Sequence, residues 1–390
     1  MFTPNQSPPP AELTAIVLAA GASTRMHGFK PLLDLGGQSV LARVVGLLQN
    51  GGAAPVVVVT GHRAPELEPL VRQLGARPVF NPAHVQGMFS SLRAGLAALP
   101  SRAEAFFLLP VDIPLVRAHT LIRLVQAWAA GQGPVLLPTF QGEPGHPPLI
   151  STELVPAIAA HDGAGGLRGF WEAHPGLIAE VPVADRFILR DQDRPEDYQA
   201  LRDELPGYHA PSPAECLTLL SEVAGLSAEL VIHSRAVGAV ALALAQQVNT
   251  AGGGLDQDLA LAGGLLHDLA KGTPDHAAAG AAQLRELGFA AVAPLAAGHV
   301  DLEVDGQAPL SEVELVHLAD KLVQGGRLVG LEERFAAKLA RHGDQAQARA
   351  AIQRRRETAR LIRQRVEQAM GKSLDQALAK VDPGGTEWTG

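Results

Sequence analysis

The segment LAAGASTRMHGFKPLL (Leu18 to Leu33) combines a small-residue turn with two basic side chains. Gly21 permits close backbone approach to a ligand, and the small residues after it leave backbone N–H groups free to face an anion. Arg25 and Lys30 add two positive charges five residues apart. The spacing matches neither the dinucleotide fingerprint G-x-G-x-x-G nor the G-K-[ST] of a P-loop. It predicts a phosphate-binding loop of another kind, with a glycine turn beside two surface cations as the alternative.

Carboxylates follow apolar segments later in the same half of the chain. FFLLPVDIP runs from an apolar strand into Asp112, and ILRDQDRPEDY supplies Asp191 and Asp193 after what we interpret as another apolar strand. Mg²⁺ prefers one or two carboxylates together with phosphate oxygens. Combined with Arg25 and Lys30, which would offset phosphate charge, the pattern predicts Mg²⁺-dependent nucleotidyl transfer from a nucleoside triphosphate to a substrate phosphate. The alternative for Asp112 is that it caps the next turn.

A His-Asp pair stands at the end of an otherwise apolar helix in the second half. His267 and Asp268 lie in DLALAGGLLHDLAKG, and polar groups buried there without partners would cost roughly 2–7 kcal/mol each. Partners of the right type stand on other predicted helices, His233 before them and Asp320 after them. Imidazole and carboxylate ligands from separate helices suit a divalent transition metal such as Mn²⁺, Fe²⁺ or Zn²⁺. The alternative is a set of mutually satisfied core polar groups.

Two kinds of element must position these groups. Between residues 13 and 204, the near-continuous apolar runs TAIVLAAG, PVVVVTG, AFFLLPVD and GPVLLP alternate with helix-length segments. This predicts an α/β domain with a doubly wound, mostly parallel sheet, whose ligands bind beyond the carboxyl ends of the strands. Residues 205–213 form a Pro-rich linker, and residues 214–377 show apolar spacing of three to four residues and no convincing strand, which predicts an all-helical domain. Residues 1–12 are expected to be a disordered tail.

The charge balance argues against a nucleic-acid partner. The 390 residues include 32 basic and 40 acidic side chains, for a formal net charge of −8, whereas broad nucleic-acid binding depends on an excess of positive charge. For the same reason we interpret the run Arg354, Arg355 and Arg356, in a polar helical pair near the end of the chain, as a solvated face.

Cysteine usage and hydropathy bear on the compartment. The single cysteine, Cys216, cannot form an intramolecular disulfide, which fits a reducing environment. No apolar run approaches the roughly 18 residues needed to span a bilayer. We therefore expect a soluble cytoplasmic protein with no membrane partner.

The first half resembles a known family over about 190 residues. Leu18 to Lys30 is similar to the L-A-A-G-x-S-x-R-M-G-x-x-K signature of molybdenum cofactor nucleotidyltransferases, nearest their cytidylyltransferase branch. Further matching segments, in the family's order, are VVTGH, NPAHVQGMFSSLRAGL, the Asp112-Ile113-Pro114 step, GEPGHPPLI, DGAGGLR and DQDRPEDY. The resemblance implies a fold like that of nucleotide-diphospho-sugar transferases.

The resemblance also implies roles for individual residues. The implied nucleotide-binding residues are Ala20, Gly21, Arg25, Lys30, Gly87 and Ser91. The implied Mg²⁺ ligands are Asp112 and Asp191, and the implied acceptor-binding residues are Gly145, His146 and Arg168. Arg25, Lys30 and Asp112 would form the catalytic set.

The implied substrates are CTP and the molybdenum cofactor. The Ala-Ala-Gly opening is similar to the branch that favours CTP over GTP, so the product would be molybdopterin cytosine dinucleotide, destined for an apo molybdenum hydroxylase. His27 departs from the signature because it stands where the family usually has glycine, which bears on the choice of base. A sugar-phosphate acceptor on the same scaffold remains an alternative.

The second half resembles the HD-domain metal-dependent phosphohydrolases over about residues 214–330. Matched residue by residue, the implied ligands of the HD metal are His233, His267, Asp268 and Asp320. Lys271 would assist with the substrate phosphate as a catalytic residue, and His276 and His299 match histidines used for a second metal or for substrate. His317, one helical turn before Asp320, is assigned to packing or to supporting the metal ligands. The alternative is an HD domain that binds a ligand and regulates the transferase without turnover.

Overall fold

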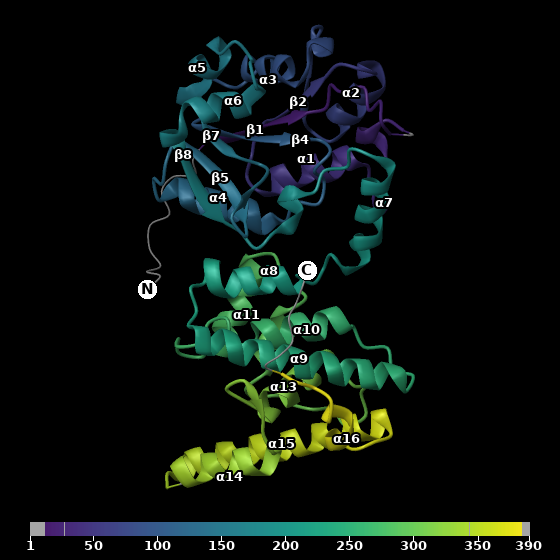
Figure 1. Cartoon of the computed structure of the whole chain (residues 1–390), viewed down its shortest axis with the longest axis vertical. Coiled ribbons are helices and arrows are strands. Elements are labelled where there is room, and N and C mark those ends of the chain that lie inside the picture. Colours follow the sequence, from purple (N-terminus) through teal and green to yellow (C-terminus); the bar gives the residue numbers. More distant parts are fainter. Residues whose placement is uncertain (1–11, 27, 343, 384–390) are drawn as a thin grey trace. The chain divides into compact units, whose positions relative to one another are not determined.

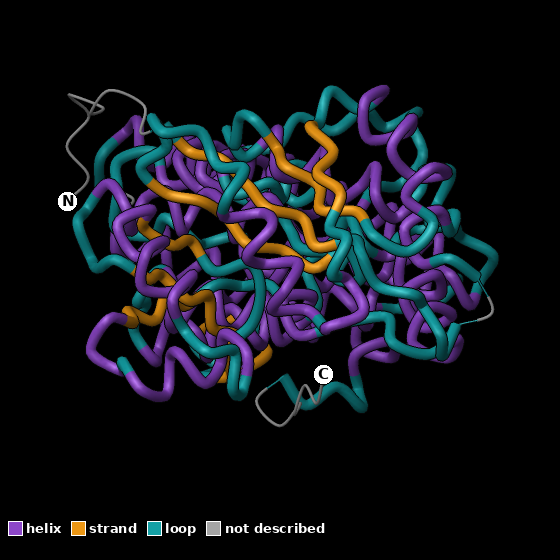
Figure 2. Tube along the Cα trace, turned by 90° about the horizontal axis from the view of Figure 1, so that it is seen from above, coloured by secondary structure: helices purple, strands orange, loops and turns teal. Residues whose placement is uncertain are grey.

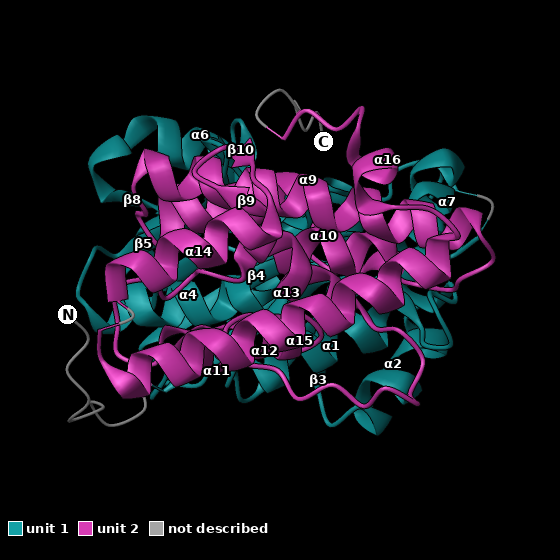
Figure 3. Ribbon diagram, turned by 90° about the horizontal axis from the view of Figure 1, so that it is seen from below, with its two compact units in different colours: residues 1–206 teal, residues 207–390 magenta. Residues whose placement is uncertain are grey.

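The computed structural model describes residues 12–383 with the exception of residues 27 and 343. It divides the chain into two compact units, Met1–Pro206 and Gly207–Gly390 (Figure 3). The predicted tail, apart from Glu12, and the departure from the signature at His27 lie outside the described residues.

Unit 1 is built on a mixed sheet of eight described strands in which parallel pairing predominates. The strand order is β3-β2-β1-β4-β7-β5-β6, with β8 paired to β5. Strands β3, β2, β1 and β4 are mutually parallel, and only β7 and β6 run antiparallel to their neighbours. The strands are β1 (Leu13–Leu18), β2 (Val56–Thr60), β3 (Arg77–Phe80), β4 (Ala105–Pro110), β5 (Val135–Phe140), β6 (Glu143–Pro144), β7 (Leu149–Ser151) and β8 (Ile178–Pro182). The predicted α/β fold class is confirmed.

Helices cover both faces of this sheet (Figures 1 and 2). The α-helices are α1 (Val40–Asn50), α2 (Ala64–Gln73), α3 (Met88–Leu96), α4 (Ala118–Ala129), α5 (Val155–Ala160), α6 (Gly166–Ala173) and α7 (Pro195–Glu204). The short 3₁₀ helices are η1 (Lys30–Leu32), η2 (His84–Gln86), η3 (Thr152–Leu154), η4 (Pro175–Leu177), η5 (Arg186–Leu189) and η6 (Leu205–Gly207). α3, α5 and α6 pack on one face through a core that includes Ile16, Leu92 and Phe106. The central strands are therefore buried on both faces, which is why they are apolar without alternation.

The sequence predicts that Asp191 follows an apolar strand, but in the structure it does not. The apolar residues before it form η5, and β8 ends earlier at Pro182. The backbone N–H of Gln192 donates to the carbonyl of Asp112 at 3.0 Å. This bond, and not strand pairing, brings the DQD segment to the carboxyl end of β4.

Unit 2 is helical apart from one small hairpin, β9 (Val323–Gln324) and β10 (Arg327–Leu328), which the sequence analysis did not predict. Its helices are α8 (Pro213–Thr218), the π-helix η7 (Leu219–Val223), α9 (Ala228–Thr250), α10 (Gln257–Leu266), α11 (His276–Glu286), α12 (Ala293–Gly298), α13 (Glu312–Leu322), α14 (Leu331–His342), α15 (Ala346–Met370) and α16 (Leu374–Leu378). Its core includes Val240 of α9, Leu318 of α13 and Ile362 of α15.

Two glycines let α9 and α10 approach closely. A Cβ atom at Gly264 of α10 would lie 2.6 Å from the Cα atom of Gly238 in α9, so any larger residue would push the helices apart. This contact sets the separation of His233, near the start of α9, and His267, which follows the last residue of α10.

α9 is long and apolar enough to pass a length-and-composition test for a membrane span, contrary to our expectation from the sequence. Half of its most apolar window is buried inside the fold. The helix packs against α10 and α13, so its apolar composition is accounted for by the helical core.

Candidate functional site

A pocket of about 250 Å³ opens at the carboxyl ends of β1 and β4 in unit 1. Most of the residues implied for nucleotide binding and one implied Mg²⁺ ligand line it, namely Ala20, Gly21, Lys30, Gly87, Ser91 and Asp112. A Cβ atom at Gly21 would meet no protein atom within 4 Å. Internal packing therefore does not require the glycine, and the open space beside it is compatible with close approach of a ligand.

Lys30 joins two carboxylates at this pocket. Its Nζ atom lies 3.2 Å from Oδ2 of Asp112 and 2.8 Å from Oδ1 of Asp193. Arg25 Nη1 lies 3.5 Å from the other oxygen of Asp193. Burial lowers the pKa of Lys30, but Asp193 and Asp112 outweigh burial and raise it overall. The ammonium group therefore stands where it neutralises the carboxylates.

Asp191 carries the excess negative charge of the cluster. Burial raises the pKa of its carboxyl, and the neighbouring Asp193 and Asp112 raise it further. Carboxylates whose mutual repulsion disfavours ionisation form a donor set that a hard dication such as Mg²⁺ stabilises. The residues present therefore fit the implied Mg²⁺. Next to Asp191, the buried side-chain amide of Gln192 has no hydrogen-bond partner on either polar atom, and sequence reasoning did not identify it.

Buried Asn81 holds Ser90 and Ser91 in place beside the pocket. Its amide Nδ2 donates to Ser90 Oγ at 2.9 Å and to Ser91 Oγ at 3.0 Å, while its Oδ1 accepts from the backbone N–H of Ala83. Asn81 and His84 both stand in the matching segment NPAHVQGMFSSLRAGL, to which sequence reasoning gave no role at these positions, and His84 lines the pocket.

None of the three implied acceptor-binding residues lines this pocket. His146 is largely buried with Nδ1 unpartnered; burial lowers the pKa of its imidazole, and the charge of nearby Asp112 opposes this shift. At Gly145 a Cβ atom would lie 2.5 Å from the carbonyl oxygen of Ile188, so packing by itself explains the glycine. Arg168 lies outside the pocket lining, and its Nε pairs with Glu172 at 2.9 Å.

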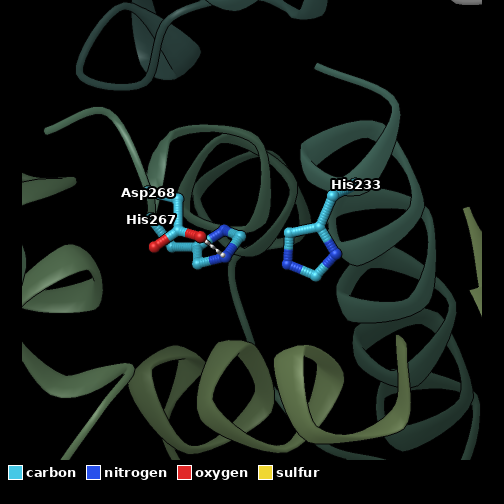
Figure 4. Close-up of side chains that lie close together, drawn as sticks. All are labelled: His233, His267 and Asp268. Carbon is cyan, nitrogen blue, oxygen red and sulfur yellow. Dashed lines mark ion pairs between the residues drawn. The ribbon is translucent and has the colours of Figure 1, made fainter. Parts of the chain in front are cut away.

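In unit 2, His233, His267 and Asp268 converge from α9 and from the turn after α10 (Figure 4). His267 Nε2 lies 3.5 Å from Asp268 Oδ2 and 3.8 Å from Asp320 Oδ1, and His233 Nε2 lies 3.3 Å from the same Asp320 oxygen. The four implied ligands are therefore brought together from two helices, α9 and α13, and from the turn after α10.

The hydrogen bonds of the histidines leave one ring nitrogen of each directed at the carboxylates. His267 Nδ1 lies 2.7 Å from the carbonyl of Gly264, which can only accept, so Nδ1 carries the proton. The other ring nitrogen, Nε2, is fully buried, has no hydrogen-bond partner among the described residues and faces two carboxylates. A cation between Nε2 and the carboxylates would satisfy these groups, and metal-binding histidines usually donate their other ring N–H to a backbone carbonyl or carboxylate, as Nδ1 does here. The residues present fit a divalent transition metal.

A second cluster shares Asp268. His276 Nε2 and His299 Nε2 lie 3.3 and 3.2 Å from Asp268 Oδ1, and His299 Nδ1 is bonded to the carbonyl of Ala296. Burial raises the pKa of Asp268, but His267, His299 and Lys271 outweigh burial and hold it well below its ordinary value. Asp268 is therefore ionised and able to bridge two cation positions.

Two basic residues that sequence reasoning missed contact Asp320. Lys321 Nζ lies 2.7 Å from Asp320 Oδ2, and Arg334 Nη2 lies 3.4 Å from Oδ1. Lys321 directly follows Asp320 in the sequence, so it was identifiable; Arg334 comes from α14 and has no motif. Lys271, named from the resemblance, pairs with Asp268 at 3.0 Å.

Comparisons with known proteins agree with this division. Residues 15–177 match the family model of the MobA-like NTP transferase domain, and residues 230–324 match that of the HD domain. The predicted resemblance of the two halves is confirmed. The chain therefore contains a nucleotidyltransferase domain of this type followed by an HD domain.

Curated relatives match the first half. The bifunctional protein GlmU of Mycobacterium sp. (strain KMS) is 31% identical over 191 residues, which are 46% of this chain. The chain spans only 38% of the length of that relative. The molybdenum cofactor cytidylyltransferase of Escherichia coli (strain K12) is 27% identical over 188 residues, covering 48% of this chain and 93% of the relative.

Among solved structures, Rv0371c from Mycobacterium tuberculosis H37Rv aligns with a TM-score of 0.44 and 25% identity, covering 50% of this chain and 99% of that one. A cytidylyltransferase from Leptospira borgpetersenii aligns with a TM-score of 0.41 and 17% identity, covering 50% and 87%.

Proposed function

We propose that the chain is a cytoplasmic bifunctional enzyme. Residues 13–204 would transfer a nucleotidyl group from CTP to the molybdenum cofactor, and residues 214–377 would form an HD domain, with its helical extension, that hydrolyses a phosphoester. The observation that carries the first activity is Lys30 held between Asp112 and Asp193 at the carboxyl ends of parallel strands.

In the transferase, the loop residues bind and orient the triphosphate. Arg25 and Lys30 offset its negative charge, while Asp112 and Asp191 hold Mg²⁺, which when bound supplies charge neutralisation at the reacting phosphates. Lys30 would exchange its carboxylate partners, Asp112 and Asp193, for oxygens of the bound triphosphate. An acceptor phosphate oxygen attacks the α-phosphorus, and pyrophosphate leaves; no protein nucleophile takes part.

CTP and the molybdenum cofactor are supported by the Leu18 to Lys30 motif and by the similarity to a molybdenum cofactor cytidylyltransferase. An apo molybdenum hydroxylase would then receive the product, and Gly145, His146 and Arg168 would contact the acceptor. The second candidate is transfer to a sugar phosphate. His146 beside Asp112 is compatible with either acceptor.

In the HD domain, His233, His267, Asp268 and Asp320 would hold a transition metal, which when bound activates water for attack on phosphorus. His276 and His299 would hold a second metal or the substrate. Lys271, half-exposed beside Asp268, would bind the substrate phosphate. A regulatory HD domain without turnover is the alternative.

The transferase is tested with α-labelled CTP, molybdenum cofactor and Mg²⁺. We expect label to move to the cofactor, more slowly or not at all with GTP, and to be lost in Asp112→Ala. Label transfer to sugar phosphates alone would establish the second candidate, and transfer to no acceptor would contradict both.

The hydrolase is tested by screening phosphate esters and anhydrides with Mn²⁺, comparing the wild type with His267→Ala. Hydrolysis that the substitution abolishes supports catalysis. Metal binding without hydrolysis of any compound supports the regulatory alternative.

A further inference from the structure

The pocket in front of the HD carboxylates is rich in positive side chains. It has a volume of about 280 Å³ and is lined by Lys271, Lys321, Arg334, Lys338 and Arg355, against the two carboxylates Asp268 and Asp320. Arg334 and Lys338 come from α14 and Arg355 from α15, which both lie beyond the residues of the HD match. The C-terminal helical extension therefore forms part of this site.

Two of these cations have unused donors. Lys271 and Lys321 pair with the site carboxylates, and Arg355 binds Asp301 through Nε and Nη2 at 2.7 Å each. Arg334 uses Nη2 on Asp320, but its buried Nη1 has no hydrogen-bond partner. Among the residues that the structure describes, Lys338 has no partner in a hydrogen bond or an ion pair. α14 therefore carries positive charge and hydrogen-bond donors that have no partner among the described residues.

The basic lining continues away from the metal-binding residues. A second cavity, of about 550 Å³ between α14 and α15, shares Arg334, Lys338 and Arg355 with the first and adds Arg341. Burial, followed by the charges of Arg334 and Lys321, lowers the pKa of Lys338 to about 8. The charge of Asp320 opposes this shift without cancelling it.

The pocket holds more positive side chains than are needed to neutralise Asp320. Five positive side chains face three carboxylates when Asp301 is included, and a dication bound by the histidines would widen the excess. Arg334 and Lys338 are one helical turn apart, so they lie on the same face of α14 and present their donors to one place. Repulsion between such groups is relieved by a bound anion.

We propose that Arg334 and Lys338, beside Arg355, bind a second phosphate group of the HD substrate. The substrate class is then a phosphoric anhydride, with two or more phosphates in series, and not a phosphomonoester. The proposal rests on the hydrolase function proposed above. In the reaction water adds its oxygen to one phosphorus, the bridging P–O bond breaks, the bridging oxygen leaves with the electron pair, and the solvent receives the released proton.

The test measures anion binding separately from turnover. Full-length protein carrying Lys30→Gln, which weakens phosphate binding at the transferase site, is treated with EDTA and titrated calorimetrically with inorganic tripolyphosphate and with orthophosphate. Lys338→Gln is added to this background, and Arg354→Gln serves as the matched control. Arg354 is an exposed cation on α15 outside both cavities.

We expect Lys338→Gln to weaken tripolyphosphate binding at least about tenfold, as for loss of a charged hydrogen bond. Orthophosphate binding should change less, and Arg354→Gln should leave both unchanged. Unchanged tripolyphosphate affinity in Lys338→Gln, or equal weakening by Arg354→Gln, would overturn the subsite.

Turnover with Mn²⁺ separates this inference from the proposed function. A raised KM for anhydrides in Lys338→Gln, with little change in kcat, supports the subsite. Lys338-dependent binding without hydrolysis keeps the subsite but refutes the hydrolase. Hydrolysis of monoesters only, indifferent to Lys338, keeps the hydrolase but refutes the subsite.

Discussion

Replacing His267 by phenylalanine distinguishes a metal site from a polar core. The substitution keeps an aromatic ring at a fully buried position, so no large cavity forms. It removes the Nδ1 hydrogen bond to Gly264 and also the unpartnered Nε2.

The two effects on metal-free stability oppose each other. Loss of the hydrogen bond costs about 1 kcal/mol, whereas removal of a buried unsatisfied acceptor returns roughly 1–3 kcal/mol. In EDTA we therefore expect His267→Phe to range from as stable as the wild type to about 2 kcal/mol more stable. With free Mn²⁺ at a hundred times its dissociation constant, the wild type should gain about 2.7 kcal/mol and the variant almost nothing.

The assay is thermal unfolding of the full chain with EDTA and over a Mn²⁺ series. His317→Phe is the matched control, because His317 is also fully buried, bonds through Nδ1 to the carbonyl of Gly298 and has an unpartnered Nε2, but is not in either ligand cluster. The control should keep the Mn²⁺ response. A large loss of stability in EDTA together with a wild-type Mn²⁺ response in His267→Phe would refute the reasoning.

Lys30→Ala should lower kcat for nucleotidyl transfer by about 10²–10³, the usual loss when a charge-stabilising group is removed; retention of wild-type kcat would contradict its role. Asn81→Ala should raise KM for the nucleotide about tenfold with kcat nearly unchanged, because Ser91 loses its anchor; steady-state kinetics decide, and a fall in kcat alone would argue against positioning. Hydrogen bonds from Arg360, and then those from Arg356, lower the pKa of Glu332 from 4.5 to about 2. The ion pairs of Glu332 therefore stabilise the packing of α14 against α15 fully above pH 4.5, and this stabilisation is lost as the pH falls toward 2. An NMR titration of Glu332 checks this sign, and a midpoint near 4.5 would contradict it.

The sequence allowed prediction where a reactive side chain stands next to an element with a clear apolar pattern. Buried parallel strands are apolar throughout, so β1, β2, β4 and β5 were recognisable, whereas β3 and β7 have four and three residues and no such signal. Asp112 was found because it lies two residues after the end of β4. The placement of Asp191 depends on a backbone bond from Gln192, which no periodicity reveals.

The basic wall of the HD pocket was missed for a related reason. Arg355 and Arg356 were interpreted as solvated, but they bind Asp301 and Glu332, acidic residues far away in the sequence, and only Arg354 of that run is exposed. The i, i+4 spacing of Arg334 and Lys338 was a usable signal, since it places two cations on one face of a helix. This spacing indicates a binding site only because Asp320 lies close to the two cations, and that placement depends on the packing of α13 against α14.

The decisive measurement is transfer of labelled CMP from α-labelled CTP to the molybdenum cofactor by the full chain with Mg²⁺, made in parallel on Asp112→Ala and His267→Ala. We expect transfer by the wild type, none by Asp112→Ala and an undiminished rate with His267→Ala, because the two sites lie in separate units. Transfer that persists in Asp112→Ala, or that no acceptor elicits from the wild type, would contradict a nucleotidyltransferase built on Lys30 and Asp112.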